Sequence, residues 1–69
     1  MLLELLEKLK DKKQEVSIET KSGKTYRGMV LKIKNGVITL EYEGAYGNMR
    51  CIFLSCDGIE SIEFYPFNI

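Results

Sequence analysis

The side chains best suited to chemistry are cations that surround two predicted turns and the strand between them. They are Lys21, Lys24, Arg27, Lys32 and Lys34, and Tyr26 lies among them. Lysine and arginine bind phosphate through charge, and an aromatic ring stacks on a nucleobase. This combination favours a surface that binds the phosphate backbone of a nucleic acid with little discrimination among bases. Lysines beside turns also serve simply to keep a surface solvated, and this alternative stays open.

Catalytic residues are much harder to find. The chain contains no histidine, so the usual general base and the central member of a serine or cysteine triad are both missing. Asp57 and Glu60 form a conceivable carboxylate pair, but the first lies in a predicted turn and the second on a short strand, which is typical of surface acids. The glycines of the 44–48 stretch lack the lysine and serine of a phosphate loop. We therefore expect a binding protein and not an enzyme.

The two cysteines, Cys51 and Cys56, predict neither a disulfide framework nor a metal site. One C-x4-C pair cannot supply the four ligands of a zinc site, and no histidine is present to complete it. We expect no metal and no cofactor. Two cysteines without a predicted signal peptide indicate a reducing compartment, so we expect a cytoplasmic protein with free, packed thiols. No apolar run approaches the ~20 residues of a membrane span.

Charge is balanced overall but unevenly distributed. Ten basic residues cancel ten acidic ones. From Lys8 to Lys34 there are nine basic and three acidic residues, which gives +6, whereas from Glu41 to Glu63 there are one basic and five acidic residues, which gives −4. The folded chain is therefore bipolar if the fold separates these segments. Ordinary solvated charge is the alternative.

Periodicity predicts one domain over residues 1–69, with a helix at 1–13 and five strands within 16–67. Leu2, Leu5, Leu6 and Leu9 have the spacing of one helical face. From Val16 the period changes to the two-residue alternation of a strand. The strands are expected at 16–20, 25–32 or 33, 37–42, 49–55 or 56, and 59–65. The turns between them contain Gly23, Asn35-Gly36 and Asp57-Gly58, and the longest loop is 43–48.

The second strand is expected to be apolar on both faces. One face is predicted to carry Tyr26, Gly28 and Val30, and the other Met29, Leu31 and Ile33. Gly28 within the strand permits a sharp bend. In the third strand, Ile38, Leu40 and Tyr42 are predicted to face inward. The five strands together predict a mainly β fold, an antiparallel meander with the helix on one side.

Size makes self-association the expected source of additional stability. A chain of 69 residues and 7.9 kDa buries only about 60% of its unfolded surface, which is marginal for an isolated domain. Disulfides and metals, the other devices that stabilise small domains, are not predicted here. We therefore expect the chain to associate with copies of itself.

The order of elements and two sequence stretches resemble the Sm-like family over nearly the whole chain. The stretch Ser22–Val30 fits the first Sm motif, with a glycine turn at Gly23 and a second glycine, Gly28, two places before an apolar residue. The stretch Ile52–Ile62 resembles the second motif, in which a hydrophobic pair leads through a short turn into the last strand. The resemblance implies a strongly bent, five-stranded antiparallel barrel capped by an N-terminal helix.

In that family about five to eight copies close into a ring, with the fourth strand of one copy pairing with the fifth strand of the next. The resemblance therefore implies an interface formed by Met49, Cys51, Phe53, Ile62, Phe64 and Tyr65, with Phe67 nearby. These side chains are also suitable for the core of a monomer, so this alternative stays open. A closed ring pairs both strand edges, which an isolated copy leaves exposed.

The resemblance also implies single-stranded RNA binding by two loops that face the pore. Asn35 falls at or beside the family's aspartate, Ile38 takes the base-stacking position and Thr39 replaces an asparagine, while Ser55-Cys56 replaces Arg-Gly. With the basic cluster added, the RNA-binding candidates are Lys24, Tyr26, Arg27, Lys34, Asn35, Ile38, Thr39, Ser55 and Cys56. The missing amide and guanidinium, together with the zero net charge, favour the alternative of an oligomeric protein-interaction scaffold without RNA.

Overall fold

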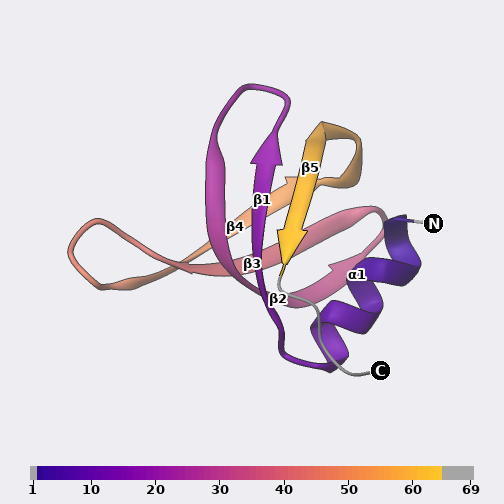
Figure 1. Ribbon diagram of the computed structural model, residues 1–69, viewed down its shortest axis with the longest axis horizontal. Coiled ribbons are helices and arrows are strands. Elements are labelled where there is room, and N and C mark those ends of the chain that lie inside the picture. The colour runs from indigo at the N-terminus through magenta and orange to yellow at the C-terminus, as the bar shows by residue number, and fades with distance from the viewer. Residues whose placement is uncertain (1, 65–69) are drawn as a thin grey trace.

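A computed structural model describes residues 2–64 and contains one helix and one five-stranded antiparallel sheet (Figure 1). The elements are α1 (Leu2–Asp11), β1 (Glu15–Thr20), β2 (Thr25–Lys34), β3 (Val37–Glu43), β4 (Met49–Ser55), the 3-10 helix η1 (Cys56–Gly58) and β5 (Ile59–Phe64). The prediction of a helix followed by five antiparallel strands is confirmed. Tyr65, Phe67 and the end of the predicted 16–67 barrel lie outside the described residues.

The sheet has the strand order β4-β3-β2-β1-β5 and is not closed. Strands β1 to β4 pair with one another in sequence order, and β5 returns to pair with β1. This leaves β4 and β5 as the two edges, each with one side that pairs with no other described strand. Such edges are templates for pairing with another chain.

The N-terminal helix α1 uses its leucine face to cover the core. Leu6 and Leu9 are fully buried, and Leu5 packs beside them. The helix ends two residues earlier than predicted because Lys13 adopts a positive φ of 53°. The N–H groups of Lys13 and Gln14 then donate to the carbonyls of Lys10 and Leu9, both at 3.0 Å, which caps the helix with the pattern of a Schellman motif.

The core is apolar and is formed by one face of the sheet together with the leucines of α1. Its buried residues are Leu6, Leu9, Val16, Ile18, Val30, Ile38, Leu40 and Leu54. Strand β1 shows the predicted alternation, since Val16 and Ile18 are buried while Glu15 and Glu19 are exposed. The opposite face of the sheet, called the outward face below, carries charged and polar side chains together with exposed apolar ones such as Phe53 and Met49.

A β-bulge in β2 changes which residues face outward. Val30 pairs with Leu40, but the next pair along is Lys32 with Thr39, so Leu31 has no partner of its own. The bulge turns Ile33, opposite Ile38, toward the core on the same side as Val30. The prediction that Ile33 and Val30 lie on opposite faces is therefore wrong. Its consequence is that Lys32 and Lys34 both face outward.

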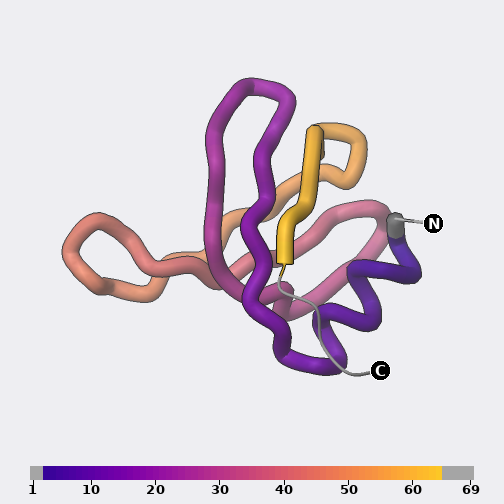
Figure 2. Tube along the Cα trace, in the orientation of Figure 1, coloured from indigo at the N-terminus to yellow at the C-terminus, as the bar shows by residue number. Residues whose placement is uncertain are grey.

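Gly28 lies where β2 and β3 approach each other too closely for a side chain. It pairs with Val16 on one side and Tyr42 on the other. A Cβ at this position would collide with the carbonyl oxygen of Glu41 and lie 2.9 Å from the Cα of Tyr42. Figure 2 shows β2 curving strongly along its length, from its pairing with β1 toward the side of α1. Glycine is required in this bent strand because only it fits the contact with β3.

Candidate nucleic-acid interface

Two rows of outward side chains cross β2, β3 and β4 near the β2–β3 turn. The first row is Lys32, Thr39 and Phe53, and the second is Lys34, Val37 and Ser55. Directly opposed residues of antiparallel strands place their side chains on the same face. The register therefore gathers two lysines, two hydroxyls and two apolar side chains on one side of the sheet.

These rows form a shallow hollow of about 370 Å³. Its lining residues are Lys32, Lys34, Asn35, Val37, Thr39 and Phe53. Both lysines are exposed, and Phe53 has 75% of its surface exposed, so it forms an apolar wall at the β4 side. The lining contains no acidic residue, so nothing within it opposes an anion. Ammonium groups, an amide and a hydroxyl are the groups that bind phosphates and base edges.

The two turns at this end of the sheet are held together by a backbone hydrogen bond. Asn35 and Gly36 both have positive φ, 53° and 74°, as the two-residue hairpin turn predicted from their sequence requires. The N–H of Cys56 donates to the Gly36 carbonyl at 2.9 Å, which fixes η1 beside this turn. The Ser55 hydroxyl accepts from the N–H of Asp57 at 3.3 Å and caps η1. Ser55 and Cys56 thus lie beside the lysine hollow.

The structure brings together five of the predicted RNA-binding residues and separates the other four. Lys34, Asn35, Thr39, Ser55 and Cys56 all lie at the β2–β3 turn end of the sheet. Ile38, although it lies on the same strand as Thr39, is 0% exposed and belongs to the core. Its predicted position in the base-stacking place is therefore wrong, because no base can reach a buried side chain.

Lys24, Tyr26 and Arg27 lie at the opposite end of β2. Lys24 directly precedes β2 at the β1–β2 turn, whereas Lys34 ends β2 at the β2–β3 turn. Tyr26 is half-buried and packs edge-on against Tyr42, with ring centroids 5.2 Å apart. None of these three residues lines the hollow that contains Lys34.

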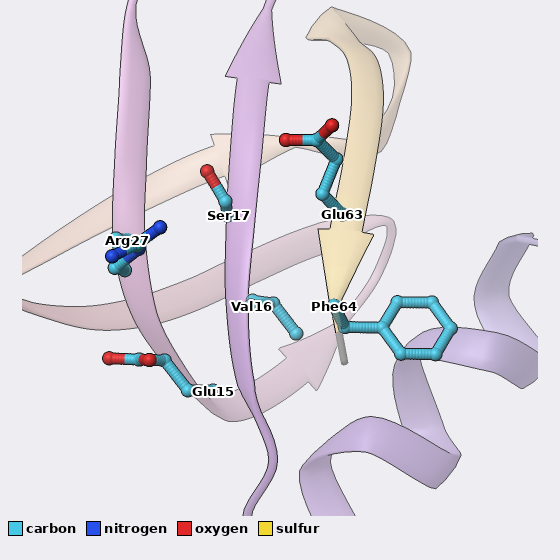
Figure 3. Close-up of a pocket in the computed structure, with 6 residues that line it drawn as sticks. All are labelled: Glu15, Val16, Ser17, Arg27, Glu63 and Phe64. Atoms are coloured by element: carbon cyan, nitrogen blue, oxygen red, sulfur yellow. The ribbon is translucent and has the colours of Figure 1, made fainter. Parts of the chain in front are cut away.

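Arg27 lines a different hollow, of about 260 Å³, beside the β5 edge (Figure 3). Figure 3 shows Arg27, Ser17 and Glu63 in a row across β2, β1 and β5, with Glu15 below Arg27. Two carboxylates flank this hollow, so it is a poor site for phosphate. Arg27 and Glu15 of the basic segment thus lie in one hollow with Glu63 of the acidic segment, so the two segments are not separated here.

The residues predicted for an interface occupy the two edges in different ways. Met49, Cys51 and Phe53 are exposed and share one face of β4, whereas Ile62 of β5 packs against the core. Phe64 lies at the end of β5 and is partly exposed. Both thiols are free, and Cys56 packs against the core as predicted, but the prediction that Cys51 is a packing residue is wrong because it is exposed.

Sequence reasoning missed the contribution of Val37, and it assigned Phe53 to the interface alone. Lys32 was grouped with the basic cluster, but its neighbours were not identified. Counting residues outward from the Asn35-Gly36 turn pairs Lys34 with Val37 and Lys32 with Thr39. These four neighbours could therefore be predicted from the position of the turn.

No family model and no curated protein matches the chain, so a function must be inferred from the arrangement of its side chains. Over residues 2–64 no helix combines the length and apolar character needed to cross a bilayer. The same residues contain no cluster of three or more side chains suited to holding a metal ion.

Proposed function

We propose that this chain is an Sm-like protein that assembles into a ring and binds single-stranded RNA on its outward lysine hollow. The observation that carries the proposal is the gathering of Lys32, Lys34, Asn35 and Thr39 in one hollow without an acidic residue. The helix and the strand order β4-β3-β2-β1-β5 supply the framework that positions these residues. The function is binding and not catalysis.

The hollow is suited to the RNA backbone more than to particular bases. Lys32 and Lys34 contribute ammonium groups for phosphates, and the Asn35 amide and Thr39 hydroxyl donate and accept hydrogen bonds. The fork of a guanidinium, which reads a base edge in two places, is not among the lining residues. We therefore expect weak discrimination among bases and a strong dependence on salt.

Assembly follows from the two open edges and their charges. Strand β4 carries Arg50 and no acidic residue, whereas β5 carries Glu60 and Glu63 and no basic residue. Pairing β5 with another β5 brings four glutamates together, but pairing β4 with β5 of the next copy brings opposite charges together. Such a head-to-tail contact repeats, and it closes into a ring when the rotation permits. In this proposal about five to eight bent sheets close as a ring of barrel-like subunits.

A ring also multiplies the lysine hollow. Each copy contributes one hollow, so a single RNA strand contacts several hollows at once, and the affinity of the whole exceeds that of one copy. This repetition accounts for RNA binding by a chain whose net charge is zero.

A protein-interaction scaffold is the second candidate, and one observation favours it. The β3–β4 connection projects from the rest of the molecule, as Figure 1 shows, and its Tyr46 is 95% exposed. Tyrosine is among the residues that most often anchor protein interfaces. In this case the ring assembles but binds no RNA.

Fluorescence anisotropy with labelled oligouridine and oligoadenine tests the RNA proposal. We expect saturable binding of both at about 50 mM salt, with dissociation constants within about threefold of each other, and at least tenfold weaker binding at about 200 mM. Failure to saturate below about 100 μM protein at low salt would leave the scaffold as the function. A preference of more than about 100-fold for one base would contradict backbone recognition.

A further inference from the structure

The phenyl ring of Phe53 forms one wall of the lysine hollow and is largely uncovered. Its side of β4 faces solvent, and the residue is 75% exposed, more than Met49 on the same strand. Within residues 2–64 no second aromatic ring packs on it. Apolar surface is unfavourable in water, so a flat ligand that covers this ring is stabilised by the contact.

The strand register places the ring in one row with a hydroxyl and a cation. Phe53 pairs directly with Thr39, and Thr39 pairs directly with Lys32. The three side chains therefore stand on the outward face, across two strand spacings of about 5 Å each. Because a lysine side chain is long and flexible, its ammonium group can meet the phosphate of a nucleotide whose base lies on the ring.

Strand β4 holds the ring in a fixed position. Ile52 and Leu54, on either side of Phe53, pack toward the core, so the backbone that carries the ring is anchored. Phenylalanine has only two side-chain torsions, and little conformational freedom is lost when a flat group stacks on it. The ring is thus already arranged for stacking before a ligand arrives.

Charge and direction favour a nucleotide over a protein partner as the group that covers the ring. The pairing groups of β4 lie in the plane of the sheet, whereas the ring stands roughly perpendicular to it, so a copy that pairs with this edge leaves the ring on the outward face. An apolar protein surface placed on the ring would also cover Lys32 and Lys34, and the hollow has no acidic residue to pair with them. A nucleotide supplies both an aromatic face and a negative charge.

We propose that Phe53 is the base-stacking residue of the lysine hollow, so that each copy holds one nucleotide with its base on the phenyl ring and its phosphate on Lys32 and Lys34. This inference rests on the proposed RNA-binding function and identifies the residue that selects single strands. Every base has an aromatic face, so stacking adds affinity without choosing among bases. The bases of a duplex already stack on one another, and they cannot reach the ring.

Fluorescence anisotropy of Phe53→Ala with four ligands of equal length tests the stacking. Oligouridine and oligoadenine offer free bases, whereas an abasic strand and an RNA duplex keep the phosphates but offer none. We expect the variant to bind both single strands at least about tenfold more weakly than the wild type does. Its affinity for the abasic strand and the duplex should change less than about twofold, and its dependence on salt should be unaltered, because both ammonium groups remain.

Two further variants separate stacking from a structural effect. Phe53→Leu keeps an apolar side chain but no aromatic face, so it should lose affinity for single strands as Phe53→Ala does. Met49→Ala is the matched control, because it removes an exposed apolar side chain from the same face of β4 outside the hollow, and it should bind like the wild type. Circular dichroism and native mass spectrometry check that fold and assembly are retained, as expected for substitutions at exposed positions.

Phe53→Trp provides a direct signal from the ring itself. The chain has no other tryptophan, so emission excited at its red edge reports on position 53 alone. We expect oligoadenine to quench this emission as it saturates the protein, and the abasic strand to leave it unchanged. Wild-type affinity of Phe53→Ala or Phe53→Leu for single strands, equal losses for the abasic strand, or unquenched tryptophan would each overturn the stacking while RNA binding stands. A wild type that binds neither oligonucleotide would instead overturn the proposed function.

Discussion

Gly28→Ala is expected to lower the free energy of unfolding by about 3 kcal/mol or more, well beyond the ~0.5 kcal/mol typical of a substitution at an exposed surface position. The added methyl group would collide with the Glu41 carbonyl oxygen, and it would also lie 2.8 Å from the Glu41 carbonyl carbon. Both atoms belong to the backbone of β3, which cannot rotate away as a side chain can. Strands β2 and β3 must separate, and this disturbs the pairing that connects the core to the lysine hollow.

Urea unfolding followed by circular dichroism at one protomer concentration measures this effect. Gly58→Ala is the matched control, because a Cβ at Gly58 meets no atom within 4 Å and its φ is not positive. Its unfolding free energy should change by less than about 0.5 kcal/mol. Equal midpoints for the two variants would show that the close contact of β2 with β3 is not as described.

The double substitution Lys32→Glu and Lys34→Glu is expected to weaken RNA binding at least about 30-fold at low salt. It removes both ammonium groups from the hollow and places two carboxylates there, and each ring would carry this change in every copy. Both side chains are exposed, so the fold should be retained. The slope of log affinity against log salt should also become shallower, because fewer phosphates are neutralised.

The matched control is Lys21→Glu with Lys24→Glu, which changes the net charge by the same amount. These lysines lie at the β1–β2 turn, at the other end of β2 from Lys34. We expect less than about a threefold loss of affinity for this variant. Equal losses in the two double variants would mean that binding follows net charge alone, and the hollow would not be the site.

The fold was predictable from turns and periodicity, and the β2 bulge shows how far such reasoning extends. Counting from Gly23 places Val30 inward, whereas counting back from the Asn35-Gly36 turn places Ile33 inward. These two positions have opposite parity within one strand, so a bulge between them is required. The structure has it at Leu31. The sequence therefore contained evidence for a bulge. The prediction of a regular strand, with Val30 and Ile33 on opposite faces, was wrong.

The candidate site was only partly predictable because burial and distance depend on tertiary structure. Strand alternation correctly predicts that Ile38 faces inward, and its partner Ile33 lies beside it at the core. Only the resemblance to the Sm-like family places Ile38 where a base would stack. Arg27 looked like part of a basic cluster, although the pairing of β2 with β1 and of β1 with β5 places it in one hollow with Glu15 and Glu63. Nothing local to Arg27 could indicate this.

Native mass spectrometry of the wild-type chain at about 10 μM tests the central claim, that the open β4 and β5 edges join copies head to tail. We predict a closed oligomer of about five to eight copies of the 7.9 kDa chain, and no larger open series. A folded species at 7.9 kDa under these conditions would contradict the account, because both edges would then remain unpaired in a stable protein.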